Sequence, residues 1–222
     1  MVRHTADSVN GIQAVSVFLT LLGSADYARG ELMEYQELLR YQVTAGIILI
    51  NIIIFVLINL KVVRVDKLGS SYIETIQNRQ FYRVVSSAFT QKEFMHLACN
   101  MYSLYNIGRT LEHALGSNLF ALCYVVIMAV GGLMSARIHK KGSPFTLSIG
   151  ASGVICGLLG IYMVIAYTVF GFGGIRSLIP TIILLIAMTA SNRIDSIGHF
   201  TGLFIGIVCG FVLVNVYSFG YR

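Results

Sequence analysis

Charged residues are scarce in this chain. Asp, Glu, Lys and Arg make up 12% of its 222 residues, whereas 56% are hydrophobic, and proline occurs only twice. The few charges gather between long uncharged stretches, which excludes an ordinary soluble domain and places the chain among polytopic membrane proteins. The net charge of +6 does not indicate a nucleic-acid partner, because most basic residues lie in short loops where Lys and Arg anchor helices at lipid headgroups.

The sequence also shows neither paired cysteine spacing nor the pattern expected of a signal peptide. The four cysteines lie inside apolar stretches without paired spacing, which argues against a disulfide framework and a metal site: Cys99, Cys123, Cys156 and Cys209. We therefore expect no metal site at these cysteines. Residues 1–40 show no basic region followed by a small-residue cleavage site. Their uncharged run, residues 8–25, contains several polar side chains, so an interfacial or cytosolic helix is favoured over a membrane span.

Long apolar runs fill the rest of the chain. They predict an all-α polytopic membrane protein whose domain, residues 41–217, ends in a short tail, residues 218–222. Both termini then lie on one side of the membrane, and no internal repeat or separate soluble domain is evident. The six predicted spans are residues 41–60, 94–115, 119–136, 150–170, 178–190 and 197–217, with a longer charged connection at residues 61–93.

Four polar residues at the starts of predicted spans carry the chemistry. Ser152 lies near the start of the fourth span and His199 near the start of the sixth, while His96 and Asn100 share one face at the start of the second. Spans two, four and six run in the same direction, so these four side chains can meet at one depth near one membrane face. Polar residues inside spans are costly and usually functional.

Each of the four has a plausible chemical role. His199 could remove the proton of Ser152, which would attack a carbonyl and form an acyl-enzyme. His96 and Asn100 could stabilise the oxyanion, assisted by the backbone N–H groups at the helix start. The alternative is that His96 and Asn100 only join helices and that His199 is an interfacial residue. Asp195, four residues before His199, is expected to be a solvated loop carboxylate rather than the third member of a triad.

Glycines recur every four residues behind both candidate catalytic residues. Small residues at this spacing let two helix backbones approach closely, so the sixth span is expected to pack on the fourth and bring His199 to Ser152. Contact of the same glycines with some other helix is the alternative. The glycines of the expected contact are Gly153 and Gly157 in the fourth span, and Gly202 and Gly206 in the sixth.

Taken in order, these motifs resemble those of the rhomboid intramembrane serine proteases over roughly residues 41–217. The resemblance implies a six-transmembrane-helix rhomboid-like bundle with a semi-embedded first loop and a Ser152–His199 dyad. It also implies an oxyanion site at His96 and Asn100, no cofactor or metal, and cleavage of single-span or other transmembrane proteins. Tyr82 replaces the tryptophan that the family usually has before Arg83. The motifs are His96-x-x-x-Asn100, Gly150-x-Ser152-Gly153 and His199-x-x-Gly202-x-x-x-Gly206.

Two other functions and one question of orientation remain open at this stage. A catalytically inactive relative that binds membrane clients normally lacks the serine or the histidine, and this chain keeps both. A small transporter would need charged residues within the spans, and Arg109 and Glu112 are almost alone there. The family resemblance places the multi-pass protein in the cell membrane with its active site open to the extracytoplasmic side, whereas the loop charges alone favour the reverse.

Overall fold

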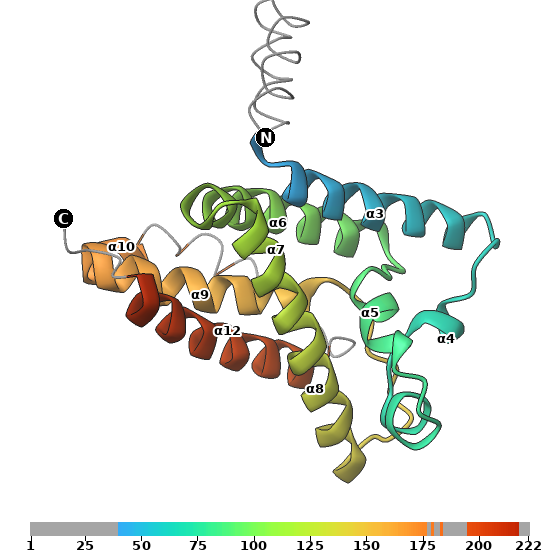
Figure 1. Ribbon diagram of the computed structural model, residues 1–222. Coiled ribbons are helices and arrows are strands. Elements are labelled where there is room, and N and C mark those ends of the chain that lie inside the picture. The colour runs from blue at the N-terminus through green and yellow to red at the C-terminus, as the bar shows by residue number, and fades with distance from the viewer. Residues whose placement is uncertain (1–39, 177–178, 180–182, 184–194, 218–222) are drawn as a thin grey trace, which may run out of the picture. The chain divides into compact units, whose positions relative to one another are not determined.

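The computed structural model describes residues 40–176, 179, 183 and 195–217. Three of the expected parts lie wholly or mostly outside these residues. They are the N-terminal segment at 1–40, of which only the last residue is described, the fifth span at 178–190, and the tail at 218–222. The chain divides into two compact units, Met1–Gln42 and Val43–Arg222, and the helices below lie in the second unit from Val43 onward. Figure 1 shows their order along the chain.

Within the described residues, four helical stretches are long and apolar enough to cross a membrane. They match four of the expected spans, and the chain is a multi-pass membrane protein. The stretches are α3 (Gln42–Asn59), Ser117–Lys141, α9 (Ser152–Phe170) and α12 (Ser196–Tyr217). The second stretch is built from α7 (Ser117–Val126), η2 (Ile127–Gly131), α8 (Gly132–Ile138) and η3 (His139–Lys141).

The expected second span also forms a long helix, α6 (Phe94–Leu115). It is not one of the four apolar stretches, because polar residues recur along it. Gly116 ends this helix with φ 77°, a backbone conformation that glycine adopts without strain. A short helix, α10 (Phe172–Arg176), follows the end of α9 at Gly171.

A buried carboxylate ties the end of α6 to the start of α3. Glu112, 2% exposed, accepts hydrogen bonds from the backbone N–H groups of Val43 and Thr44 at 3.0 and 2.9 Å. It also accepts from the hydroxyls of Thr44 and Ser117, both at 2.7 Å. The first N–H groups of a helix have no partner within that helix, so Glu112 satisfies them and its charge suits that helix end.

Residues 61–93 fold into three short helices around one buried cation. The guanidinium of Arg83 donates to the carbonyl oxygens of Asp66 and Gly69 at 2.7 and 2.8 Å, and to Oε1 of Gln80 at 2.6 Å. These hydrogen bonds thereby join Arg83 to the segment that contains Asp66 and Gly69. The three helices are α4 (Val65–Leu68), η1 (Tyr72–Gln77) and α5 (Tyr82–Ala88).

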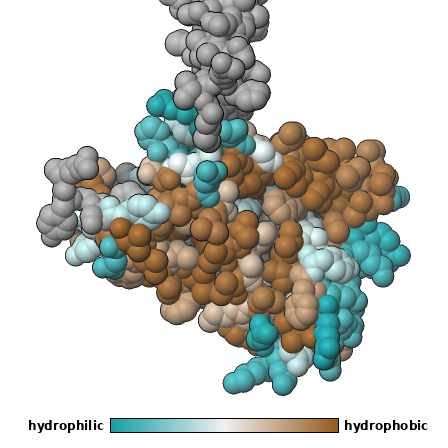
Figure 2. All heavy atoms as spheres, in the orientation of Figure 1, coloured by the Kyte–Doolittle hydropathy of each residue, from teal (hydrophilic) through white to brown (hydrophobic). Residues whose placement is uncertain are grey.

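The apolar core lies between α6, α7, η2 and α9. Its most deeply buried large side chains are at most 1% exposed: Leu104, Leu111, Phe120, Ile127, Ile155, Leu158 and Ile161. Many other large apolar side chains face outward, as expected where lipid replaces water. Figure 2 shows the resulting hydrophobic surface over the helices, with hydrophilic residues gathered around the loops.

Candidate active site

Ser152 is the first residue of α9, and the segment before it is fastened to the connection between α3 and α6. Ser148 and Ser70 exchange two backbone hydrogen bonds of 2.7 and 3.0 Å, and the N–H of Gly150 donates to the carbonyl oxygen of Ser87 at 2.9 Å. Gly150 has φ +115°, which L side chains rarely adopt. These contacts hold the hydroxyl of Ser152 at the start of its helix.

The four glycines named from the sequence lie in the contact between α9 and α12. A Cβ built on Gly202 would collide with the carbonyl oxygen of Gly153, and one built on Gly206 would collide with that of Gly157. The two backbones therefore touch without intervening side chains, and the helices run side by side (Figure 1). This close approach brings the start of α12 to the start of α9.

His199 and Ser152 are hydrogen-bonded. Nε2 of His199 lies 2.7 Å from Oγ of Ser152, and the two residues are 9% and 5% exposed. The other ring nitrogen, Nδ1, is buried and has no hydrogen-bond partner among the described residues. In the neutral tautomer that carries its proton on Nδ1, Nε2 accepts the hydroxyl proton of Ser152, which is the arrangement of a nucleophile and its base.

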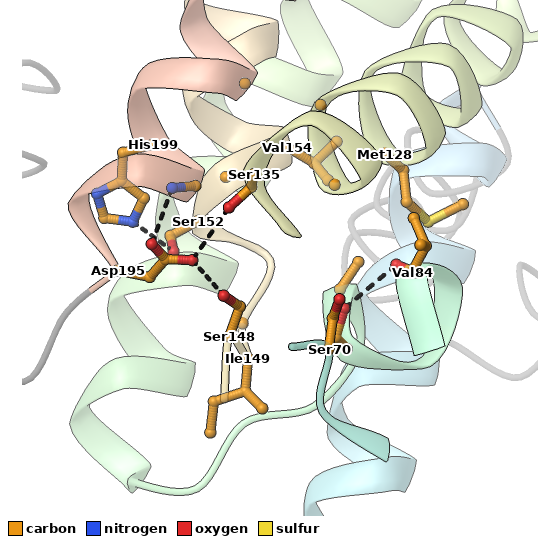
Figure 3. Close-up of a pocket in the computed structure, with 18 of the residues that line it drawn as sticks. Ser70, Val84, Met128, Ser135, Ser148, Ile149, Ser152, Val154, Asp195 and His199 are labelled. Atoms are coloured by element: carbon orange, nitrogen blue, oxygen red, sulfur yellow. Dashed lines mark hydrogen bonds between the residues drawn. The ribbon is translucent and has the colours of Figure 1, made fainter. Parts of the chain in front are cut away.

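Asp195 does not form a triad with His199, and it is less exposed than a solvated loop carboxylate. One oxygen accepts the N–H of Gly198 at 2.9 Å and lies 3.3 Å from Nε2 of His139. The other accepts hydrogen bonds from the hydroxyls of Ser148 and Ser135 (Figure 3). The side chain, 15% exposed, thus joins the start of α12 to the segment that precedes Ser152.

His96 and Asn100 lie next to this same segment. A Cβ at Gly150 would be 3.0 Å from Cε1 of His96, and Nε2 of that ring is buried without a partner in the described part of the chain. Asn100 is fully buried; its Nδ2 donates to Oε1 of Gln91 at 3.0 Å, while its Oδ1 has no described partner. The Asn100 amide thus uses one of its two N–H groups in a described side-chain bond, and Nε2 of His96 uses none.

A cavity of about 60 Å³ opens beside the hydroxyl of Ser152, lined mainly by small residues. A water molecule needs about 10–15 Å³ of such volume, so the cavity has room for a few waters. Serines supply its polar atoms, and Figure 3 shows Ser70, Ser135 and Ser148 around it with Asp195 and His199. Among the described residues, no group of three His, Cys, Asp or Glu side chains is placed to hold a metal ion.

Several residues of this site were not predicted from the sequence. Asn51, Gln91 and Ser148 were not singled out, and Asp195 was placed in solvent. One signal was available, because Ser148 precedes Ser152 by the same four residues by which Asp195 precedes His199. Asn51 and Gln91 carry no such signal, since their contacts join segments 40 residues apart.

Comparison with known proteins indicates the family of this chain. Residues 78–216 match the Rhomboid domain. RHOMBOID-like protein 5 of Arabidopsis thaliana is 31% identical over 160 residues, which cover 70% of this chain and 51% of that protein. Rhomboid-like protease 1 of Toxoplasma gondii is 27% identical over 160 residues, covering 68% of this chain and 52% of that protein.

A third relative, Rhomboid protein 1, mitochondrial, of Saccharomyces cerevisiae, is 35% identical over 85 residues, or 36% of this chain and 23% of that protein. The chain spans about half the length, or less, of the curated relatives described here. The Rhomboid domain match covers more than half of the chain. This chain belongs to the rhomboid family.

Proposed function

We propose that this chain is an intramembrane serine endopeptidase that cleaves transmembrane segments of other membrane proteins with a Ser152–His199 dyad. The observation that carries the proposal is the 2.7 Å hydrogen bond between Nε2 of His199 and Oγ of Ser152 beside a cavity large enough for a few water molecules. A transporter has no use for such a pair, and a client-binding relative without activity has no need of one. Membership of a family that contains proteases adds to this support.

The reaction follows from the geometry of the pair. Oγ of Ser152 adds to the scissile carbonyl carbon as its proton passes to Nε2 of His199. An N–H of Asn100 and the ring of His96 stabilise the oxyanion. The tetrahedral intermediate then collapses, the C–N bond breaks, and His199 gives its proton to the leaving amine. Water from the cavity, deprotonated by His199, hydrolyses the acyl ester and restores the hydroxyl of Ser152.

The proposal includes the surroundings of the site. Six spans, 41–60 to 197–217, form the domain 41–217, with α6 and the residues around 178–190 completing the bundle. Residues 61–93 form a semi-embedded first loop, whose Phe81 and Tyr82 are about half exposed and suited to the membrane interface. Residues 1–40 form an interfacial or cytosolic segment, and residues 218–222 a tail. Substrates are single-span or other transmembrane proteins, and the chemistry needs no metal or cofactor.

We place the domain in the cell membrane, with the cavity open to the extracytoplasmic side. This orientation can be tested by introducing a single reactive cysteine at exposed Lys140 into a variant whose four native cysteines are replaced by serine or alanine. Lys140 lies in η3, close to Asp195 through its neighbour His139. A membrane-impermeant maleimide should label intact cells expressing this variant. Labelling only after the cells are broken would reverse the orientation.

The function is tested with the full chain, purified in detergent and incubated with a single-span model substrate. Wild type should cut the substrate, and Ser152→Ala and His199→Ala should each abolish cleavage. The double variant should be no worse than either single variant, because the two residues act as one unit. Exposed Ser143 and His113 provide matched controls, and Ser143→Ala and His113→Ala should cleave at the wild-type rate. Cleavage by Ser152→Ala at a substantial rate would refute the assignment.

A further inference from the structure

Three side-chain amides form a buried chain that ends at Asn100. Nδ2 of Asn51, on α3, donates to the carbonyl oxygen of Ile47 at 2.9 Å. Nε2 of Gln91, which lies between α5 and α6, donates to Oδ1 of Asn51 at 3.3 Å, and Nδ2 of Asn100 donates to Oε1 of Gln91 at 3.0 Å. All three amides are 0% exposed.

The hydrogen bonds that link these three amides can run in only one direction. A carbonyl oxygen accepts hydrogen bonds and cannot donate them, so Ile47 obliges Asn51 to present its NH₂ group to it and its oxygen to Gln91. Gln91 must then use its NH₂ group toward Asn51, which leaves its oxygen for Asn100. Asn100 in turn must present its NH₂ group to Gln91. The orientation of the Asn100 amide is thus determined by the backbone carbonyl of Ile47, three hydrogen bonds away.

The Asn100 end of this series of hydrogen bonds lies beside the segment that precedes Ser152. A Cβ at Gly150 would be 3.6 Å from Oε1 of Gln91 and 3.0 Å from the ring of His96. Asn100 has a second N–H that Gln91 does not use, and Oδ1 of the same amide is buried without a described partner. Buried polar atoms are normally paired, so the unpaired Nε2 of His96, which donates in one neutral tautomer, indicates a position for an acceptor atom of a ligand. Oδ1 of Asn100 cannot contact such an atom favourably, so the second N–H of Asn100 is the part of this amide that could.

We propose that Asn51 and Gln91 are positioning residues that hold the amide of Asn100 with its free N–H available to the oxyanion. This inference rests on the proposed function. A rotated amide would offer its oxygen, instead of its N–H, to the negative charge that develops in the transition state. A donor aimed in advance is effective because it needs no reorganisation during the reaction. Loss of either positioning residue therefore lowers the rate of the chemical step and leaves substrate binding nearly unchanged.

The test uses variants that remove the amides and keep the side-chain length. Gln91→Met and Asn51→Leu should each lower kcat about 10-fold, with KM changed by less than about 2-fold. Asn59 provides the matched control, because it makes the same 2.9 Å bond to a carbonyl four residues earlier on α3 but is exposed. Asn59→Leu should leave both constants unchanged.

The double variant with Asn100→Ala distinguishes positioning from general stabilisation. If Gln91 acts through Asn100, Gln91→Met combined with Asn100→Ala is no slower than Asn100→Ala alone. Multiplied losses in kcat, or wild-type kcat in both Gln91→Met and Asn51→Leu, would overturn the proposal. If one variant does not fold, the other tests the same chain of bonds.

Failure of the proposed function gives a different result. In that case wild type does not cleave, or Ser152→Ala cleaves equally well, and the catalytic purpose of the amide chain is refuted with it. The bonds themselves are then measured by the Tm values of Gln91→Met, Asn100→Ala and their double variant in detergent. If the double variant lowers Tm by less than the sum of the two single variants, the series of amide hydrogen bonds is supported. Additive decreases in Tm refute it.

Discussion

Ser148 donates a hydrogen bond to Asp195, and each of these residues lies four positions ahead of one member of the Ser152–His199 pair. A second link therefore joins the same two segments close to the bond between Oγ and Nε2. Asp195 also accepts the N–H of Gly198, one of the N–H groups that have no partner within α12. The carboxylate both caps the helix that carries His199 and fastens it to the segment that carries Ser152.

Asp195→Ala should lower both stability and activity. Loss of a helix cap costs about 1 kcal/mol, and kcat should fall about 10-fold or more, because displacements of about 1 Å are enough to slow catalysis strongly. Asp195→Asn keeps an oxygen for the N–H of Gly198 and should have the milder effect on Tm. Asp66→Ala, which removes an exposed carboxylate, is the control and should leave both values unchanged. The measurements are kcat and Tm in detergent, and unchanged values in Asp195→Ala would contradict the prediction.

Asn100→Ala should reduce kcat by about 10²–10³-fold, the range for losing one oxyanion donor. KM should change far less, because the free N–H interacts with charge that develops only in the transition state. Steady-state kinetics on the single-span substrate measure both constants. A loss confined to KM would show that Asn100 binds substrate and does not stabilise the oxyanion.

Gly206→Leu should greatly reduce activity and lower Tm. Even a Cβ at this position collides with the carbonyl oxygen of Gly157, so α9 and α12 must separate, at a cost of about 1–3 kcal/mol or more. His199 then moves away from the roughly 2.6–3.2 Å range that proton transfer requires. Gly46, where a Cβ would meet nothing within 4 Å, gives the control Gly46→Leu. Full activity and unchanged Tm in Gly206→Leu would exclude this helix pairing in the membrane protein.

Leu213→Ala should affect stability without affecting catalysis, although Leu213 lies on the same helix as His199. Its place near the far end of α12 predicts that Leu213→Ala leaves cleavage largely intact. The side chain is nevertheless 5% exposed and belongs to the core. Removing buried methyl groups from such a site costs about 2–5 kcal/mol. We therefore expect a lower Tm with nearly normal kcat for the folded protein. A reduced kcat, measured at a temperature well below the Tm of the variant, would mean that the far end of α12 affects Ser152 and His199.

Glu112→Ala should destabilise the protein without removing its chemistry. The carboxylate accepts four hydrogen bonds, and each buried donor left without a partner costs about 1–3 kcal/mol. Glu112 lies 12 residues after Asn100 on α6, or about 18 Å along the helix, so kcat below the Tm should stay close to wild type. Thermal unfolding and kinetics decide the matter, and an unchanged Tm would contradict the role assigned to Glu112.

The helices were largely predictable because each leaves a local pattern. Long uncharged runs bounded by Arg40 and Lys61, or by the Gly171 break, indicate spans at the length that a bilayer requires. The bounds of α6 were predicted despite its polar residues, since its end at Gly116 has a recognisable turn signal. The approach of Ser152 and His199 followed from helix direction and from glycine spacing, both of which are readable along the chain.

The supporting contacts of the site were not predictable in the same way. Asn51 sits in an apolar run as a single polar residue, and Gln91 sits in an irregular connection. Their pairing depends on how α3 packs beside residues 40 positions later, and hydrogen bonds between distant side chains leave no periodicity in the sequence. Asp195 was misplaced for the same reason, because its partners His139 and Ser148 are about 50 residues away in the chain.

The contact between α9 and α12 is made by backbone atoms at Gly153, Gly157, Gly202 and Gly206. Hydrophobic mismatch with the bilayer changes the tilt of membrane helices. Because backbone contacts backbone at these four glycines, we expect the two helices to tilt together and to keep the distance from Ser152 to His199. Asn100 stands on a different helix, α6. Under the proposed function, a thinner or thicker bilayer should therefore change the alignment of Asn100 with Ser152 more than the alignment of His199 with Ser152.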